Sequence, residues 1–259
     1  MQDQPDNPIK EKPRSQVASS AITRLPPLTP GRRFLRRVII GLARMLLAVC
    51  TRTETYGFEN IPPGGPMLVV SNHLGDADFV VGIAMPPVVV DALAKAELYD
   101  HPVAGPFLKA YGVIWVHRGQ PDRRALRAVL DGLHEGRMIA IAPEARESIT
   151  GALEPGTNGA AYLALKAGVP LLPVTFTGTE NARLYGNLKK LRRTVITMTV
   201  GQPFKLDDQD DRGQAIENAT QQIMGVLAAQ LPEHYRGVYR DVVGGSESGE
   251  ARQETPDGG

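Results

Sequence analysis

The sequence lacks most of the signals that would assign it to a well-marked functional class. Its single cysteine, Cys50, excludes an internal disulfide, and its apolar surroundings favour a packed residue over a nucleophile. The sequence contains no metal-ligand cluster, no phosphate-binding Walker loop, no dinucleotide-binding glycine fingerprint and no Gly-x-Ser-x-Gly elbow. A net charge of +1 gives no signature of nucleic-acid binding. We therefore expect no metal, no cofactor and no nucleic-acid partner.

The 259 residues are 42% hydrophobic, which suits one α/β domain or at most two small ones. Residues 1–30 are polar and rich in proline without apolar periodicity, which predicts a disordered segment. Residues 244–259 form a polar tail that we also expect to be disordered. Between these ends we expect a helix over residues 31–52 and a folded domain over residues 53–243.

Apolar runs and helical patterns alternate along the domain. Strands are expected near residues 67–71, 88–93, 112–117, 138–142, 170–176 and 194–200, and helices near 77–85, 100–110, 122–135, 157–168 and 213–230. This alternation predicts an α/β fold with a mixed, mostly parallel sheet flanked by helices. Pro170 and Pro173 lack backbone donors, so we expect the strand near 170–176 at an edge or a bulge of the sheet.

The segment over residues 31–52 predicts a basic amphipathic helix. Arginines fall mostly on one side and apolar residues on the other: Arg33, Arg36, Arg37 and Arg44 against Leu35, Val38, Ile39, Leu42, Leu46 and Val49. Arg44 interrupts the apolar stretch, so its charge-free part is too short to span a bilayer comfortably. We expect the helix to associate with an anionic membrane surface, apolar face in the lipid. The alternative is a helix packed on the protein's own core with a solvated charged face.

One short segment indicates chemistry directly. His73 and Asp78 stand where a predicted strand passes into a predicted helix, the place where open α/β sheets usually carry their sites. Asp78 can bind one imidazole nitrogen while the other faces substrate, which gives a base and its orienting partner without a protein nucleophile. The alternative for Asp78 is a helix cap. A second copy of the spacing, His117 and Asp122, is interpreted as a strand histidine and an unrelated helix cap, because Pro121 lies between them.

Four segments in order resemble the motifs of the glycerolipid acyltransferase family, whose best-known members are 1-acylglycerol-3-phosphate acyltransferases. The resemblance covers about residues 56–205. The family patterns are Asn-His-x4-Asp, a Gly-x-Ile-x-Val-x-Arg-like strand, Phe-Pro-Glu-Gly-Thr-Arg-Ser and Val-Pro-x-x-Pro-Val, with a recurring Lys-x-Glu-Leu stretch. The matching residues are Asn72, His73 and Asp78; Gly112, Ile114, Val116 and Arg118; Pro143, Glu144 and Ser148; Val169, Pro170, Pro173 and Val174; and Lys95, Glu97 and Leu98.

The resemblance implies an O-acyltransferase of phospholipid biosynthesis with an acyltransferase domain over residues 53–243. His73 would be the general base, oriented by Asp78, and the acyl donor would be acyl-CoA or acyl-acyl carrier protein. The substrate-binding set would comprise Asn72, Arg118, Glu144 and Arg146. Arg118 would contact the acceptor phosphate, and Glu144 either the acceptor's glycerol or the internal hydrogen bonds of the third motif. The partners would be membrane lipids, the donor and a lysophospholipid acceptor, most directly 1-acylglycerol-3-phosphate. The cytosolic donor and the basic helix place the protein as peripheral or monotopic on the cytoplasmic face of the membrane.

The third motif departs from the family pattern. Ala145 stands in place of Gly, Arg146 comes one position early, and Glu147 replaces Arg. A negative charge in that place disfavours a phosphate if it points inward. This leaves three alternatives open: an acyltransferase for a non-phosphate acceptor such as a lyso-ornithine lipid, a non-catalytic lipid-binding or membrane-adaptor protein on the same scaffold, and a thioesterase that uses water.

Overall fold

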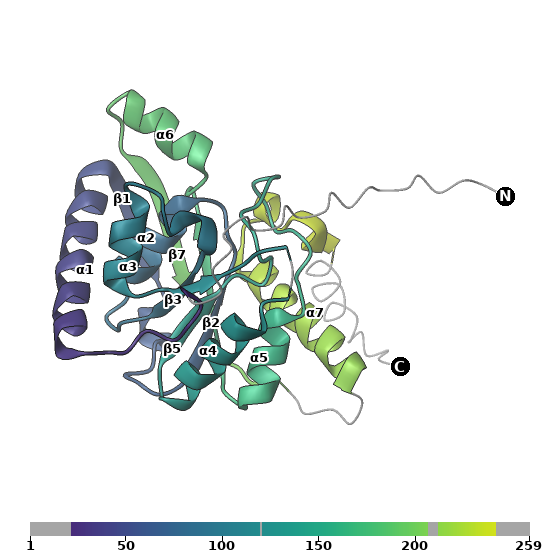
Figure 1. Cartoon of the computed structure of the whole chain (residues 1–259). Helices are drawn as coiled ribbons and strands as arrows, with labels where there is room; N and C mark the ends of the chain where they lie inside the picture. Colours follow the sequence, from purple (N-terminus) through teal and green to yellow (C-terminus); the bar gives the residue numbers. More distant parts are fainter. Residues whose placement is uncertain (1–21, 120, 207–211, 242–259) are drawn as a thin grey trace, which may run out of the picture.

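A seven-stranded sheet runs through the part of the chain that this computed structural model describes, residues 22–119, 121–206 and 212–241 (Figure 1). The strands are β1 (Thr51–Tyr56), β2 (Met67–Ser71), β3 (Asp91–Lys95), β4 (Ile114–Val116), β5 (Met138–Ile141), β6 (Leu171–Thr177) and β7 (Thr194–Val200). Their order across the sheet is β1-β7-β6-β2-β5-β3-β4. All neighbouring pairs are parallel except β6 and β7. The predicted mixed, mostly parallel sheet is therefore confirmed.

Helices cover both faces of the sheet. They are α1 (Pro30–Cys50), α2 (Asp76–Ala84), α3 (Ala104–Tyr111), α4 (Arg123–His134), α5 (Gly159–Ala167), α6 (Asn181–Lys189) and α7 (Arg212–Gln230). In Figure 1, α1, α2 and α3 lie on one side, and α4, α5 and α7 on the other. Each layer buries its own apolar core against the sheet. Because β2, β3, β4, β5 and β6 are mutually parallel, the loops after them meet at one edge, the carboxyl edge.

Two elements are not predicted by the sequence pattern, and one strand has a different position in the sheet from the one expected. The sequence gives no signal for β1 or α6, which carry many charged and polar residues. The expectation of an edge position for the strand near 170–176 is wrong, because β6 is central, between β2 and β7. Pro173 is tolerated there because the ladder with β7 begins only at Val174, so the missing N–H lies where the partner strand has already ended.

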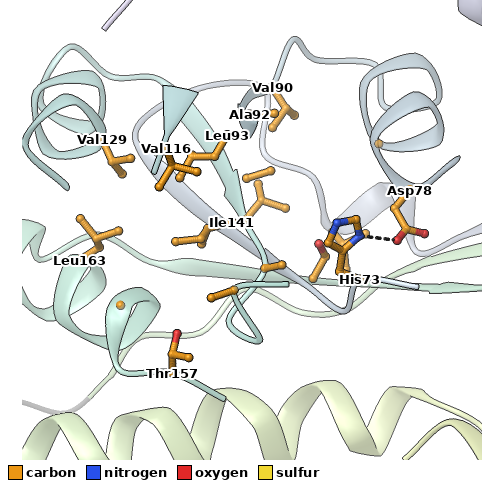
Figure 2. A pocket seen from close by; sticks show the side chains of 18 of the residues that line it. His73, Asp78, Val90, Ala92, Leu93, Val116, Val129, Ile141, Thr157 and Leu163 are labelled. Carbon is orange, nitrogen blue, oxygen red and sulfur yellow. Dashed lines mark hydrogen bonds and ion pairs between the residues drawn. The ribbon is translucent and has the colours of Figure 1, made fainter. Parts of the chain in front are cut away.

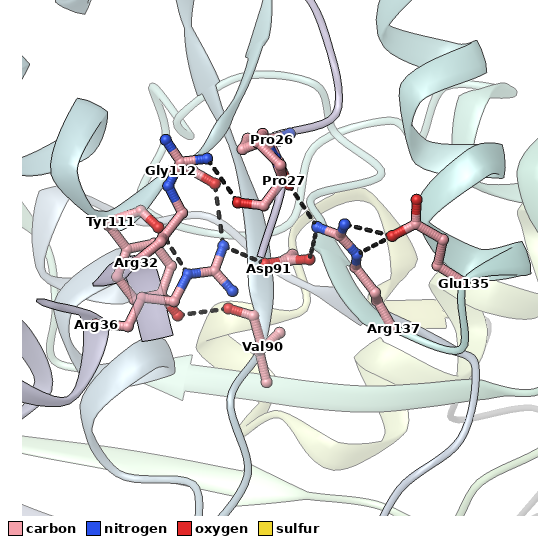
Figure 3. A network of polar contacts seen from close by, with 10 residues as sticks. All are labelled: Pro26, Pro27, Arg32, Arg36, Val90, Asp91, Tyr111, Gly112, Glu135 and Arg137. Atoms are coloured by element: carbon pink, nitrogen blue, oxygen red, sulfur yellow. Dashed lines mark hydrogen bonds and ion pairs between the residues drawn. The ribbon is translucent and has the colours of Figure 1, made fainter. Parts of the chain in front are cut away.

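Helix α1 is tied to the domain by a buried ion network at the amino edge of the sheet. Asp91 binds Arg36 at 2.5 Å and Arg137 at 3.3 Å, and all three residues are at least nine-tenths buried (Figure 3). Arg36 also donates to the carbonyls of Tyr111 and Gly112 at the end of α3. A buried carboxylate needs such partners because unpaired burial of a charge is costly. Arg36 therefore serves the fold, not the membrane surface for which the sequence pattern suggested it.

The outward face of α1 is apolar. The exposed large apolar side chains of α1 are Phe34, Leu35, Val38, Leu42, Met45, Leu46 and Val49. Arg44 donates to the carbonyls of Ala84 and Pro86, and Arg33 and Arg37 are exposed beside the apolar stripe. This arrangement differs from the alternative of a helix with a solvated charged face. Within the described residues, no helix combines the length and the hydropathy needed to cross a bilayer.

Only a part of the two segments that we expected to be disordered lies within the described residues. Residues 1–21 and the tail over 244–259 lie outside the described residues. Residues 22–29, which the sequence placed in the disordered segment, instead contact the domain: Arg137 donates to the carbonyl of Pro26 at 2.9 Å, and Thr23 is buried. The reason is that the carbonyl groups of this stretch supply acceptors for buried arginines, a contact that composition does not reveal.

The ion network predicts a large loss of stability when its carboxylate is removed. Asp91→Asn should lower the free energy of unfolding by about 3–5 kcal/mol, because two buried guanidinium groups lose their shared counter-charge. Urea denaturation of the whole chain measures this loss. Glu54→Gln is the control, since the pair of Glu54 with Arg52 is largely exposed, and it should cost under about 1 kcal/mol. Equal losses in the two variants would contradict the buried tether.

Candidate active site

The loop between β2 and α2 carries the predicted histidine and aspartate to the carboxyl edge. His73 Nδ1 lies 2.9 Å from Asp78 Oδ2 (Figure 2). The side chain of Asp78 is 6% exposed and that of His73 is 22% exposed. His73 Nε2 has no hydrogen-bond partner among the described residues. With Nδ1–H donated to the carboxylate, Nε2 keeps its lone pair free for a proton from a substrate. The structure thus brings the predicted pair together in a geometry suited to a general base.

Asp78 also closes the turn that carries His73. Its Oδ2 atom accepts backbone N–H groups from Leu74 at 2.7 Å and Gly75 at 3.0 Å, so the cap-like alternative and the pairing with His73 occur together. Gly75 is required by close approach, since a Cβ there would lie 2.4 Å from the carbonyl oxygen of Thr179. The loop after β6 is therefore packed directly against the turn, and it fixes the position of the imidazole.

The third motif holds the backbone of His73 from both sides. Glu144 Oε1 accepts the His73 N–H at 3.0 Å, and the Ser148 N–H donates to the His73 carbonyl at 2.7 Å. The other oxygen of Glu144 accepts the N–H of Glu154. Burial raises the pKa of Glu144 to about 7, against the lowering effect of these two backbone donors. Both carboxylate oxygens of Glu144 accept hydrogen bonds from the protein's own backbone. This arrangement favours the expected role of Glu144 in the internal hydrogen bonds of the motif over contact with the acceptor.

Two further residues of the expected substrate-binding set are also occupied by the protein. The amide of Asn72 exchanges two hydrogen bonds with the backbone of Phe176, at 2.9 and 2.8 Å, and so joins the ends of β2 and β6. Arg146 forms an ion pair with Glu154. The amide of Asn72 and two of the guanidinium nitrogens of Arg146 are therefore engaged by the protein, where they stabilise the loops of the site. Sequence reasoning missed Glu154, whose partner lies eight positions away in an irregular loop.

Arg118 differs from these residues because its guanidinium has no hydrogen-bond or ion-pair partner among the described residues. It lines the cavity that contains His73. Burial lowers the pKa of Arg118, while the carboxylates of Glu97 and Glu147 raise it. A partly desolvated guanidinium without a direct partner is suited to an anionic group such as a phosphate. The role of Arg118 in binding the acceptor phosphate stays a prediction.

Glu147 also lies at this edge of the sheet. Its Oε1 atom accepts a hydrogen bond from the amide of Asn181, and the same amide's oxygen accepts the N–H of Asp76. Burial raises the pKa of Glu147, and nearby Asp76 and Asp78 raise it further. The substitution seen in the third motif therefore adds an acidic group, Glu147, beside His73. The amide of Asn181 donates a hydrogen bond to one oxygen of this carboxylate.

A cavity of about 870 Å³ opens beside His73 and extends deep into the domain. Most of its lining is apolar, with His73, Asp78, Arg118 and Asp122 among the polar exceptions. This volume falls in the upper part of the range of roughly 300–1,000 Å³ for small-molecule sites. In Figure 2 the apolar side chains gather on one side of the His73–Asp78 pair, along β3, β4, β5 and the facing helices. The site can therefore bring a long apolar group to the imidazole.

The second His-x4-Asp spacing also forms a contact. Asp122 caps α4 as predicted, accepting the N–H groups of Arg124 and Ala125. The expectation that His117 is unrelated to this cap is wrong, because His117 Nδ1 lies 3.1 Å from Asp122 Oδ2. The hydroxyl of Thr23 lies 3.3 Å from the same nitrogen. The Pro121 turn brings the two residues together outside any helix, which a helical reading of the spacing could not foresee.

Comparisons with known proteins agree with the four motifs. Residues 52–177 match the family model described as Acyltransferase. A 1-acyl-sn-glycerol-3-phosphate acyltransferase from Bacillus subtilis is 23% identical over 166 residues, 64% of this chain and 80% of the relative. A lyso-ornithine lipid O-acyltransferase from Pseudomonas aeruginosa is 32% identical over 151 residues, 58% of this chain and 56% of the relative. The chain spans about half the length of most of the curated relatives it matches.

The fold has a solved counterpart. The crystal structure of the 1-acyl-sn-glycerophosphate acyltransferase PlsC from Thermotoga maritima aligns with a TM-score of 0.57 at 22% identity, covering 76% of this chain and 80% of that chain. The chain is thus similar in sequence to glycerolipid acyltransferases, and it has the fold of this solved structure. In the described residues, no group of His, Cys, Asp and Glu is arranged to hold a metal ion.

The backbone of the third motif gives a test of its unusual sequence. Ala145 has a φ of +57°, in the left-handed region, at the position where the family pattern has glycine. Ala145→Gly should raise the free energy of unfolding by up to about 1 kcal/mol, because release of strain outweighs the entropy of glycine. Urea denaturation measures the change. Gly168→Ala is the reciprocal control: Gly168 has a φ of +62° with open space around its missing Cβ, so alanine should destabilise there. A loss of stability in Ala145→Gly would show that the turn holds no strain.

Proposed function

We propose that this enzyme transfers a fatty acyl group from acyl-CoA or acyl-acyl carrier protein to the hydroxyl of a lysophospholipid, most directly 1-acylglycerol-3-phosphate. The observation that carries the proposal is the His73–Asp78 pair at the mouth of a long apolar cavity, with Arg118 in its wall and without a hydrogen-bond or ion-pair partner in the described part of the chain. An apolar cavity suits an acyl chain, and the free guanidinium suits the phosphate of the acceptor. The acyl chain of the donor and the phosphate of the acceptor would thus be bound on either side of the imidazole of His73.

The mechanism follows from the free Nε2 atom of His73. This nitrogen takes the proton of the acceptor hydroxyl as the oxygen attacks the thioester carbonyl of the donor. Asp78 holds Nδ1–H and stabilises the imidazolium that forms. The tetrahedral intermediate then expels the thiolate, which takes the proton from His73, and the ester product remains. The reaction balances without a covalent enzyme intermediate, a metal or a cofactor, so we propose that none is required.

Part of the cavity has the shape that a donor acyl chain needs. On the α2 face the lining runs from His73 at the carboxyl edge to Val90, which directly precedes β3 at the amino edge of the sheet. The five residues of β2 between these edges span roughly 17 Å at about 3.3 Å per residue. Gly82 of α2 lines this part, where a Cβ would lie 3.5 Å from the ring of Phe176. We place the donor chain here, beneath the imidazole.

The acidic third motif favours a second candidate acceptor. Glu147 and Asp76 lie close to His73, and Arg146 is held by Glu154. An acceptor with a cationic headgroup would be attracted to such a mouth, and one curated relative is a lyso-ornithine lipid O-acyltransferase. Arg118 has no hydrogen-bond or ion-pair partner among the described residues. It supports a phosphate acceptor in preference, because an amine-bearing headgroup would leave this half-buried guanidinium without a direct partner.

We further propose that α1 holds the enzyme on the cytoplasmic face of a membrane as a peripheral or monotopic protein. The exposed apolar stripe of α1 supports lipid contact, since a contiguous apolar face on a protein surface marks an interaction site. Arg33 and Arg37 beside the stripe suit anionic lipid headgroups. The location matches the substrates, because the lysophospholipid acceptor resides in the bilayer and the acyl donor in the cytosol.

An assay of donor and acceptor together tests the proposed reaction. Purified protein is given oleoyl-CoA with 1-acylglycerol-3-phosphate, with a lyso-ornithine lipid, or with no acceptor, and thiol release and lipid products are measured together. We expect phosphatidic acid as product. His73→Ala should lower the rate at least about 10²-fold, the usual loss for a general base, and Asp78→Asn should slow it without unfolding the protein. His134→Ala, an exposed histidine at the end of α4, is the control and should have no effect.

Each other outcome of this assay points to a different function. Acylation of the lyso-ornithine lipid alone would replace the proposed acceptor. Thiol release with only free fatty acid would identify a thioesterase. No release with either acyl-CoA or acyl-acyl carrier protein would identify a non-catalytic lipid-binding protein.

The apolar stripe of α1 gives a separate prediction. Met45→Glu should weaken binding to anionic phospholipid vesicles about tenfold or more, because burial of one large apolar side chain contributes about 1.5–3 kcal/mol. Vesicle co-sedimentation measures the partition, and thermal unfolding should be unchanged since Met45 is exposed. Leu191→Glu, an exposed apolar residue in the turn between α6 and β7, is the matched control. Equal binding of wild type and Met45→Glu would remove α1 as the anchor.

A further inference from the structure

The cavity beside His73 has two apolar lobes, one on each face of the sheet. The tunnel lobe lies on the α2 face, and much of its lining is fully buried, including Val90, Met138, Leu172, Val174 and Met198. The groove lobe lies on the α4 face. Val129 and Leu163 form its buried floor, and the rest of its wall is half-buried or exposed: Leu93, Val116, Leu126, Ile141 and Tyr162. Figure 2 shows Leu93, Val116 and Ile141 of the groove lobe gathered beside the His73–Asp78 pair. The site thus offers two separate apolar volumes to one imidazole.

Two such volumes have a chemical reason in a direct transfer. No serine or threonine hydroxyl and no cysteine thiol is hydrogen-bonded to the imidazole of His73 in the described residues, so the imidazole has no protein nucleophile to activate. The acceptor hydroxyl must then attack the thioester while both substrates are bound. Each substrate carries a long acyl chain, and the product carries both. A single lobe could hold only one chain in the presence of the other.

The position of Arg118 assigns the lobes. Arg118 and Val116 line the same end of the cavity, after and at the end of β4, on the groove side of His73. A headgroup phosphate on Arg118 would leave the acceptor's glycerol between Arg118 and His73 and its chain nearest the groove lobe. The closed tunnel lobe lies directly beneath Asp78 and Phe176, where the thioester carbonyl would be attacked.

We infer that the groove lobe between α4, α5 and the end of β4 binds the acyl chain of the lysophospholipid acceptor, while the donor chain occupies the tunnel lobe. The inference rests on the proposed function, and it adds a second acyl-chain site to it. The two lobes should differ in selectivity. The buried walls of the tunnel lobe limit the length of the donor chain, whereas the open wall of the groove lobe tolerates many acceptor chains.

Photo-crosslinking tests the location of each chain without requiring turnover. The full-length protein is irradiated with 1-acylglycerol-3-phosphate that carries a diazirine at the end of its acyl chain, and the labelled peptides are mapped by mass spectrometry. We expect saturable labelling of α4 and α5, competed by unlabelled acceptor. An acyl-CoA with the same diazirine should label α2 and β6. Labelling of α2 and β6 by the acceptor probe, or no saturable labelling by it, would overturn the inference.

Substitutions in the lobes test the same assignment through turnover. Leu126→Trp narrows the groove lobe and should raise KM for a long-chain acceptor about tenfold, because each methylene withdrawn from an apolar site weakens binding about fourfold. KM for a short-chain acceptor and the preference among donor chains should stay unchanged. Gly82→Leu narrows the tunnel lobe and should shift the donor preference toward shorter chains, with the acceptor preference unchanged.

Matched controls separate a local block from a general loss of stability. Leu130→Trp makes the same change one turn further along α4, at a half-buried residue outside the cavity lining, and should alter neither preference. If thermal unfolding shows that Leu126→Trp does not fold, Tyr162→Ala is used instead. It opens the same lobe at a partly exposed wall and should lower the preference for long acceptor chains.

A changed donor preference in the groove variants would reverse the assignment. Unchanged acceptor preference in all of them would show that the acceptor chain stays in the bilayer. Absence of any acyl transfer by wild type would instead count against the proposed function, while the crosslinking map would still decide the lobes.

Discussion

The site depends on how the backbone of His73 is held. Its N–H donates to Glu144 and its carbonyl accepts the Ser148 N–H. Two residues of the third motif thus hold the backbone of His73, which belongs to the first motif. Its ring is then fixed by Asp78, which also closes the turn. Because both backbone groups and one ring nitrogen are fixed, the free nitrogen has little choice of direction. The departures in the third motif spare Glu144 and Ser148, and so leave this grip intact.

Several arginine side chains of this protein stabilise its structure by pairing with its own carboxylates. Arg36 and Arg137 neutralise a buried carboxylate at the amino edge of the sheet, and Arg146 is held by Glu154 at the carboxyl edge. Arg118 stands apart because it has no such partner among the described residues, although burial disfavours its charge. A guanidinium left unpaired in a cavity costs free energy in the empty protein, and a bound anion removes that cost. This asymmetry, more than the number of basic residues, indicates which arginine meets the substrate.

The sequence predicted the sheet and the His73–Asp78 pair because both depend on short-range patterns. Apolar runs located β2 and β5, and five-residue spacing at a strand end located the pair. The roles of Asn72 and Arg36 could not be predicted in this way. Their partners, Phe176 and Asp91, are distant in sequence, and a residue type does not say whether its polar atoms will face a substrate or the protein. Periodicity found the amphipathic α1, but only the buried Asp91 decides which side of the helix turns inward.

The cavity links the fold to the order of events in catalysis. Strand β3 pairs with β5 through only two residue pairs, Asp91 with Ile139 and Ala92 with Ala140, and then continues beside β4. The carboxyl edge is therefore open between two groups of strands, and apolar lining is present on both faces of the sheet at that point. A covalent acyl-enzyme would let the substrates bind in turn and would need one apolar lobe. In the proposed direct attack both chains are bound at once. Two apolar lobes and, among the described residues, the absence of a nucleophilic side chain on the imidazole of His73 are both consistent with that proposed chemistry.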